Sequence, residues 1–177
     1  KSGSIARIRT DANGDFIRDS LEVMGMPISA GTLYGFMTDK IDSEHRLTVT
    51  VEEIKSSMGG VNTSAILKLA TSYGKIVAAC EVAQHLLGPT VKYIGASPQV
   101  WQGDITEKHK KDFESKTNKW KGYLRDRAQE IFNCKVNIEL ADSLLIMYHG
   151  IVKERLADQF CEQVPVGERL LLSGRGV

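Results

Sequence analysis

The chain has 177 residues, of which 42% are hydrophobic and 25% are charged, with a formal net charge of +1. This length fits one domain with a sizeable core, and the near-neutral charge excludes a globally basic nucleic-acid binder, so any basic surface must be local. The three cysteines are odd in number and lack CxxC spacing, which argues against a disulfide framework or a zinc site. No signal peptide and no apolar run long enough to span a bilayer is visible, so we expect an intracellular protein.

The chain opens with the pattern of an antiparallel hairpin. Residues 3–9 and 16–23 predict two strands, and the Asn13-Gly14 pair between them is a strong turn signal. Residues 32–41 are ambiguous and predict at most a short helix.

The next strand, residues 47–53, reads LTVTVEE. Its four consecutive β-branched residues predict a buried strand, and it ends in Glu52 and Glu53. Neighbouring side chains on a strand point to opposite faces, so only one of these acids can face a given site. The alternative is an ordinary strand that runs out into solvent.

A long helix is predicted over residues 65–87, ended by Gly88-Pro89. A short strand at 91–94 follows, and Pro98 is expected to open a loop. The residues of the helix that share its predicted inward face are Ile66, Leu69, Ala70, Tyr73, Ile76, Val77, Cys80 and Ala83.

Residues 102–121 form the most charged part of the chain, flanked by Trp101 and Trp120. Aromatic side chains beside lysines can stack on nucleic-acid bases, but large aromatics more often supply buried core area. A charge run of this kind is also typical of a solvated face. Its lysines are Lys108, Lys110, Lys111, Lys116, Lys119 and Lys121.

Two more helices are predicted, over residues 120–132 and 141–159, joined by a short strand or extended link at 136–138. We expect one domain over residues 1–159 and a C-terminal tail over 160–177. Glu139 and Asp142, three residues apart, would meet on one face at the start of the last helix. Helix-capping acids are the alternative interpretation of this pair.

Three stretches taken together resemble the RuvC-type Holliday-junction resolvases, in particular their phage and organellar branch, which belong to the ribonuclease H-like superfamily. TVTVEEIKSSMGGVNTSAILKLATSYGKIVAA is similar to the family's central strand, its Glu, and the long helix with an internal glycine. SPQVWQ resembles a Pro-x-x-Trp segment, and NIELADSLLIMYHG resembles the acid-x-x-Asp signature followed by an apolar helix. The resemblance covers most of residues 47–150.

The resemblance implies an α/β fold with a mixed sheet, an antiparallel hairpin and flanking helices. It places the metal ligands on Glu52, Glu139 and Asp142, where Glu139 departs from the Asp usual in the family. A family lysine most nearly matches Lys121, with Lys119 as its rival. Lys55, Lys119 and Lys121 are then expected to bind nucleic acid.

The family's first strand, which ends in Asp-x-Gly and supplies a further metal ligand, has no counterpart in this sequence. Asp11 and Asp15 are poor substitutes, because they occupy turn positions at the far end of the hairpin. We therefore expect a short apolar strand ending in Asp-x-Gly to precede Lys1 in the complete protein.

The activity implied is Mg²⁺- or Mn²⁺-dependent cleavage of phosphodiester bonds in branched DNA by a homodimer, with two metal ions as cofactors. The compartment implied is the cytoplasm, of the host if the protein is phage-encoded, or an organellar matrix. Two alternatives remain: a non-catalytic junction-binding or scaffold module of the same fold, and a related nuclease that acts on other nucleic-acid structures.

Overall fold

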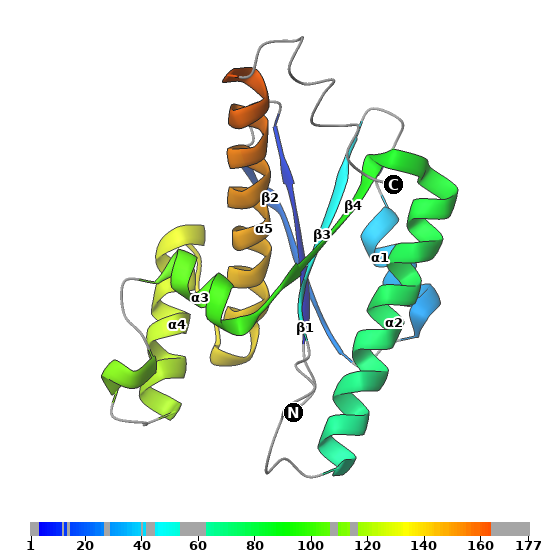
Figure 1. Ribbon diagram of the computed structural model, residues 1–177. Coiled ribbons are helices and arrows are strands. Elements are labelled where there is room, and N and C mark those ends of the chain that lie inside the picture. Colours follow the sequence, from blue (N-terminus) through cyan, green and yellow to red (C-terminus); the bar gives the residue numbers. More distant parts are fainter. Residues whose placement is uncertain are drawn as a thin grey trace.

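The computed structural model describes residues 4–11, 13, 15–26, 29–39, 41, 45–53, 63–106, 110–113 and 117–163. These residues form a mixed α/β fold with five α-helices and two two-stranded sheets (Figure 1). In chain order the α-helices and strands are β1 Ser4–Thr10, β2 Phe16–Gly25, α1 Ala30–Thr38, β3 Leu47–Glu52, α2 Thr63–Leu87, β4 Val91–Ala96, α3 Pro98–Ile105, α4 Thr117–Phe132 and α5 Ile138–Gln163. Short 3-10 turns lie at Gly88–Thr90 and Lys110–Phe113.

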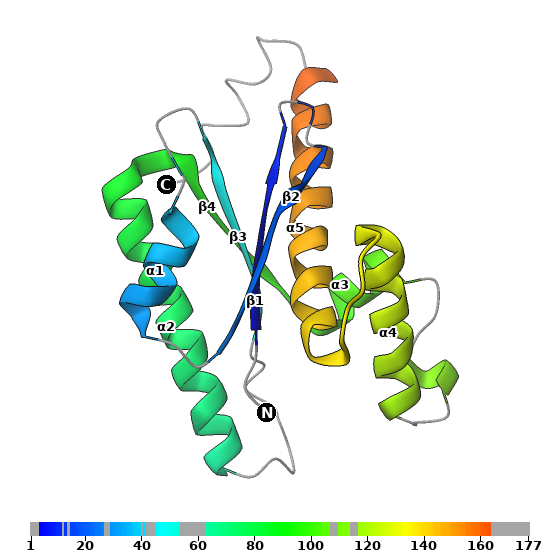
Figure 2. The same cartoon turned by 180° about the vertical axis from the view of Figure 1, so that it is seen from behind.

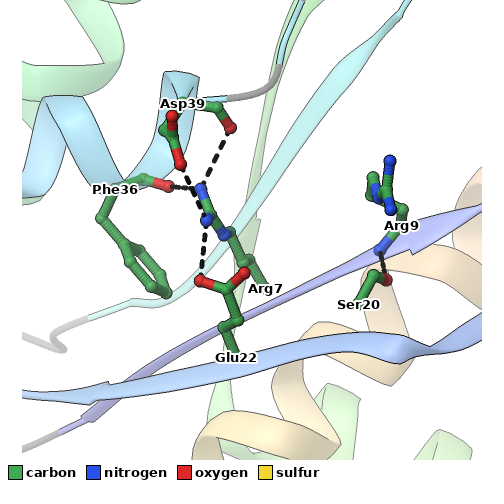
Figure 3. Close-up of polar contacts among 6 residues, drawn as sticks. All are labelled: Arg7, Arg9, Ser20, Glu22, Phe36 and Asp39. Atoms are coloured by element: carbon green, nitrogen blue, oxygen red, sulfur yellow. Dashed lines mark hydrogen bonds and ion pairs between the residues drawn. The ribbon is translucent and has the colours of Figure 1, made fainter.

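The predicted hairpin is confirmed: β1 and β2 pair antiparallel from Ser4 opposite Gly25 to Thr10 opposite Phe16. The register shifts between Arg7 and Arg9. At this irregularity the hydroxyl of Ser20 accepts a hydrogen bond from the Arg9 amide at 2.7 Å (Figure 3). A side chain thus satisfies a backbone donor that the shifted ladder leaves without a strand partner.

Arg7 fastens α1 to the hairpin. Its guanidinium donates to the carbonyl oxygens of Phe36 and Asp39 at the end of α1, and it pairs with the Glu22 carboxylate at 2.7 Å (Figure 3). A cation at this position also complements the negative end of the helix dipole. The Ser29 hydroxyl caps the other end by accepting from the Thr32 amide at 3.0 Å.

The strand that the sequence predicts over residues 47–53 is confirmed as β3. It pairs in parallel with β4, from Leu47 opposite Val91 to Glu52 opposite Ala96, and the Glu53 amide extends the ladder to the Ala96 carbonyl at 3.0 Å. Because parallel strands need a crossover between them, the long helix α2 makes this connection.

The described residues do not form one continuous sheet. β1 and β3 are neighbours across the layer, in the order β4, β3, β1, β2 (Figure 2), yet each pairs along one edge only. Helix α5 packs against both β1 and β3 on one side of the layer. The described residues therefore show two small sheets, a hairpin and a parallel pair, and not the expected ribonuclease H-like sheet.

Two apolar clusters hold these layers together. One lies between α3, α4, α5 and the hairpin, around Trp101, Trp120, Leu124, Leu144 and Leu145. The other joins α1, α2 and the parallel pair, around Leu33, Val49, Val51, Ala79 and Cys80. Both tryptophans are buried, so the core interpretation holds for each of them.

Several predicted boundaries are wrong. Pro98 begins α3 instead of a loop, since its missing N–H is no loss in the first turn of a helix. Residues 133–137 contain no strand, and the last helix runs over Ile138–Gln163 rather than 141–159. The helix therefore takes in the first residues of the expected tail, and residues 164–177 lie outside the described part of the chain. None of the helices described is both long and apolar enough to cross a membrane.

Candidate carboxylate site

The alternation of β3 places its residues on two faces. Val49 and Val51 pack into the cluster with α1 and α2. Thr50 lies on the opposite face, directly beneath Gly150 of α5, where a Cβ atom would collide with the threonine hydroxyl. Glu52, two residues after Thr50, therefore points to the α5 side of the layer, because side chains on a strand alternate with period two.

Glu52 contacts a buried tryptophan. The indole Nε1 of Trp101 donates a hydrogen bond to Glu52 Oε2 at 3.3 Å, and only 1% of the Trp101 surface is exposed. Trp101 is held there because α3 begins two residues after β4, and Ala96 at the end of β4 pairs with Glu52 itself. The β3–β4 ladder and the following helix thus fix both partners.

Asp142 and Lys121 form an ion pair that joins α5 to α4. Both side chains are about one-third exposed, so solvent screens the pair in part. One carboxylate oxygen of Asp142 bonds to the Lys121 ammonium, whereas the other, Oδ1, is buried and has no hydrogen-bond partner within the described part of the chain. An oxygen of this kind retains its capacity to bind a cation or a donor.

Glu52 and Asp142 interact electrostatically. Burial raises the pKa of the Glu52 carboxyl, the hydrogen bond from Trp101 opposes this, the negative charge of Asp142 raises the pKa further, and Lys121 lowers it. We call these four residues, Glu52, Trp101, Lys121 and Asp142, the carboxylate site. Two acids that lie far apart in the sequence thus interact at this site. Their role as metal ligands, which the resemblance implies, stays a prediction.

The third predicted ligand, Glu139, does not join them. It is exposed in the first turn of α5, and its carbonyl oxygen accepts a hydrogen bond from the Ser4 hydroxyl at 3.3 Å. Within the described ranges no three His, Cys, Asp or Glu side chains lie close enough to hold one metal ion. A role for Glu139 as a ligand stays a prediction.

Glu53 faces away from this site. Its side chain lies across Gly95 of β4, in contact with the place that a Cβ atom would occupy. Burial raises the pKa of Tyr93, and the charge of Glu53 adds to this rise. Tyr93 belongs to the α1–α2 side of the layer, where its hydroxyl contacts that of Tyr73 at 3.0 Å. Of the two acids that end the strand, Glu52 is therefore the one directed at Asp142.

The predicted phosphate-binding lysines are only partly described. Lys121 is in the carboxylate site, and Lys119 is exposed on α4. Lys55 lies outside the residues that the structure describes. Residues 118–121 form part of a regular helix, so these two lysines stand on a rigid element and not in a loop.

A second polar group lies between α3 and α5, and the sequence does not predict it. His149 of α5 is 2% exposed, and its Nδ1 lies 3.4 Å from Asp104 Oδ2 of α3, while Lys153 pairs with the same carboxylate at 2.9 Å. Burial lowers the pKa of His149, Asp104 opposes the shift, and Lys153 supports it. No motif spacing marks this group, since its members come from two helices and Asp104 precedes His149 by 45 residues.

The carboxylate site fits a hard divalent cation in its donor chemistry. Two carboxylates from different elements converge, and the free Oδ1 of Asp142 is an oxygen ligand of the kind that Mg²⁺ and Mn²⁺ prefer. Two protein carboxylates with the rest of the coordination left to water and phosphate are typical of magnesium sites. Glu52 and Asp142 are the residues that would hold the ion.

Comparison of the chain with known protein families and with curated proteins gives no match to a family model or to any curated sequence.

Proposed function

We propose that this chain is a metal-dependent endonuclease of branched DNA, with Glu52 and Asp142 as the metal ligands of its active site. The observation that carries the proposal is the convergence of these two acids, one from the end of β3 and one from the start of α5, with a buried carboxylate oxygen left without a partner. Two ionised carboxylates that repel each other in a partly buried site destabilise the fold unless a cation lies between them.

The strand arrangement supports the same proposal. In the ribonuclease H-like architecture the first strand lies between the opening hairpin and the strand that carries the central Glu. The order β4, β3, β1, β2, with no ladder between β3 and β1, is the order of such a sheet with that strand left out. On this proposal Glu52 would correspond to the family's central acid.

The chemistry follows from the positions of the side chains. A divalent ion bound there supplies Lewis-acid activation of water and of the phosphodiester. Glu52, which accepts a hydrogen bond from Trp101, and Asp142, which pairs with Lys121, would hold this ion through their carboxylate oxygens. Lys121 and Lys119 on α4 offer positive charge to the neighbouring phosphates of the DNA.

Two observations favour the non-catalytic alternative. Lys121 already neutralises one oxygen of Asp142, and two described acids are fewer than the set that the resemblance implies. A junction-binding module would keep the basic surface of α4 and need no metal. The two functions differ in whether DNA is cut, and this difference can be measured directly.

The test is incubation of the purified chain with a labelled four-way junction, with Mg²⁺, with Mn²⁺ or with EDTA. We expect symmetrical cuts with either metal and none with EDTA. Tight binding of the junction without cutting under every metal condition would favour the non-catalytic module. Faster cutting of a flap or of an RNA–DNA hybrid than of the junction would favour the related nuclease.

A further inference from the structure

Helix α3 carries the indole that contacts Glu52, and it is too short to fix its own position. It has eight residues, Pro98–Ile105, and no side chain caps its first turn. An isolated helix of this length is marginal in water, so contacts with neighbouring elements must determine where it lies. The hydrogen bond from Trp101 to Glu52 measures 3.3 Å, which is long for an N–H donor, and a small shift of α3 would weaken it further.

An acid near the end of α3 is held by α5. Asp104 is the last residue but one of α3, where the negative end of the helix dipole opposes a carboxylate. Two groups of α5 compensate for this charge. Lys153 Nζ lies 2.9 Å from Asp104 Oδ2, and His149 Nδ1 lies 3.4 Å from the same oxygen. The favourable contacts of Asp104 therefore lie across the interface with α5 and not within its own helix.

The His149 side chain is polar, buried and incompletely bonded. It is 2% exposed, and within the described part of the chain its Nδ1 takes part in no hydrogen bond, because the approach to Asp104 is too long and poorly aligned. Buried polar atoms without a partner are rare in folded proteins and require an explanation. A proton on Nδ1 would turn this atom into a charge-assisted donor to Asp104. The group thus has two states, one in which Lys153 alone holds the carboxylate and one in which the imidazolium shares it.

The charges that act on the ring come from α3 and from α5 itself. Burial lowers the pKa of His149, Asp104 raises it, and Lys153 lowers it, with a net decrease. Helix α4 and strands β1 and β3 also pack on α5, but among the described residues they contribute no charge that changes this pKa. The ring is therefore neutral at neutral pH, and Lys153 is then the cation that holds Asp104.

Asp104 and Trp101 belong to the same short rigid unit. They lie three residues apart on α3, which places them on neighbouring turns of one side of the helix. The Thr106 amide closes the end of this helix by donating to the Gln102 carbonyl at 3.0 Å. A change in the way that α5 holds Asp104 is thus transmitted through α3 to the indole nitrogen that contacts Glu52.

We propose that Asp104, His149 and Lys153 form a clamp between α3 and α5 that positions Trp101 against Glu52 and responds to the proton on His149. We call these three residues the α3–α5 clamp. Asp104 is its positioning residue, because it acts on the carboxylate site through Trp101. The effect of the clamp on metal binding rests on the proposed function, whereas its effect on the indole requires no metal.

The first experiment follows the indole in the absence of metal. In a Trp120→Phe background Trp101 is the only tryptophan, so its fluorescence emission can be recorded from about pH 8 to about pH 5. We expect a transition with its midpoint below about 6.5, the ordinary pKa of histidine, which His149→Gln removes. Asp104→Asn should move the midpoint to lower pH, since the carboxylate favours the charged ring. Any transition that remains in His149→Gln belongs to Glu52, which also contacts the indole.

The second experiment measures the Mg²⁺ affinity of Asp104→Asn and of Glu154→Gln by titration calorimetry. Each variant replaces an acid by its amide in an ion pair of α5 with a neighbouring element: Asp104 pairs with Lys153 at 2.9 Å, and the control Glu154 pairs with Lys92 at 2.8 Å. We expect Asp104→Asn to weaken binding by at least about threefold and Glu154→Gln to leave it unchanged. In a Trp101→Phe background Asp104→Asn should have no further effect, because residues that act as one unit are not additive.

The two experiments distinguish failure of the clamp from failure of the proposed function. A wild-type chain that binds no Mg²⁺, but whose Trp101 transition disappears in His149→Gln, would support the clamp and contradict the metal site. Emission that is identical with and without His149→Gln at every pH would overturn the proposal. So would an equal loss of Mg²⁺ affinity in Asp104→Asn and Glu154→Gln, or a full effect of Asp104→Asn in the Trp101→Phe background.

Discussion

The indole nitrogen of Trp101 donates a hydrogen bond to Oε2 of Glu52 at 3.3 Å, from a side chain that is itself almost wholly buried. The acid at the end of β3 is therefore held by a rigid partner from α3, on the side of the layer where Asp142 lies. A carboxylate restrained in this way loses little freedom when it binds a ligand.

The first prediction is that Trp101→Phe impairs metal binding more than it impairs folding. Phenylalanine keeps most of the apolar volume but removes the donor, and a hydrogen bond to a charged group contributes about 1.5–3 kcal/mol. We expect the affinity for Mg²⁺ to fall by about tenfold or more, measured by titration calorimetry. Trp120→Phe, which changes a buried tryptophan packed on Phe113 and Tyr123, is the control and should leave the affinity unchanged. An equal loss of Mg²⁺ affinity in the two variants would show that the Trp101–Glu52 hydrogen bond makes no specific contribution to metal binding.

The second prediction concerns phosphate contacts. Lys119→Ala combined with Lys121→Ala should flatten the slope of log affinity for junction DNA against log salt by about one to two units, because each neutralised phosphate releases counterions. Lys92 lies at the far end of the β3–β4 pair from Glu52, so Lys92→Ala should keep the wild-type slope. An unchanged slope in the double variant would mean that this part of α4 is only a solvated face.

The third prediction tests the contact between α5 and β3. Gly150→Ala adds a methyl group where Thr50 already lies, and overpacking of this kind costs about 1–3 kcal/mol. Gly35→Ala of α1, where the added atom has open space, should instead raise the free energy of unfolding by up to about 1 kcal/mol. Urea denaturation measures both changes. Adding Thr50→Ala to Gly150→Ala should recover part of the lost free energy of unfolding. A Gly150→Ala protein as stable as the wild type would contradict the close approach of α5 to β3.

The fourth prediction follows from His149. Burial holds its pKa below that of the unfolded chain, so the unfolded state binds the extra proton first as the pH falls. The free energy of unfolding should therefore decrease on lowering the pH through about 6.5, by at most about 1.4 kcal/mol per pH unit, and should level off above that value. The groups facing the ring are Asp104 from α3 and Lys153 from its own helix. His149→Gln should reduce this slope, and an identical pH profile would show that His149 does not titrate between the two states.

The fifth prediction concerns the open edges of β1 and β3. Backbone groups along these edges have no described strand partner, and each unmade buried hydrogen bond costs about 1–3 kcal/mol. We expect an added upstream segment, apolar and ending in Asp-x-Gly, to pair with these edges and to raise the melting temperature of the protein. Hydrogen exchange should show new protection in β1 and β3 of the extended protein. Exchange that is equally slow without the added segment would contradict the prediction.

The hairpin, β3, α2 and the long final helix follow from the sequence because each has a strong local signal, such as Asn13-Gly14 in the turn or the β-branched run before Glu52. The sequence does not predict helix α3, because Pro98 is a loop signal that equally suits the first turn of a helix. The meeting of Glu52 with Asp142 is a prediction that came from the resemblance and could not come from spacing. The hydrogen bond from Trp101 depends on how α3 leaves β4, which no local pattern encodes.

The most direct test of the proposed active site is the cleavage rate of a four-way junction by Glu52→Gln and by Glu53→Gln, in Mg²⁺, with junction binding measured in parallel. Both changes remove one charge and little volume from adjacent positions, but only Glu52 lies on the side of Asp142. We predict that Glu52→Gln binds the junction and does not cut it, while Glu53→Gln cuts at nearly the wild-type rate. Cleavage by Glu52→Gln at the wild-type rate would contradict the assignment of the carboxylate site.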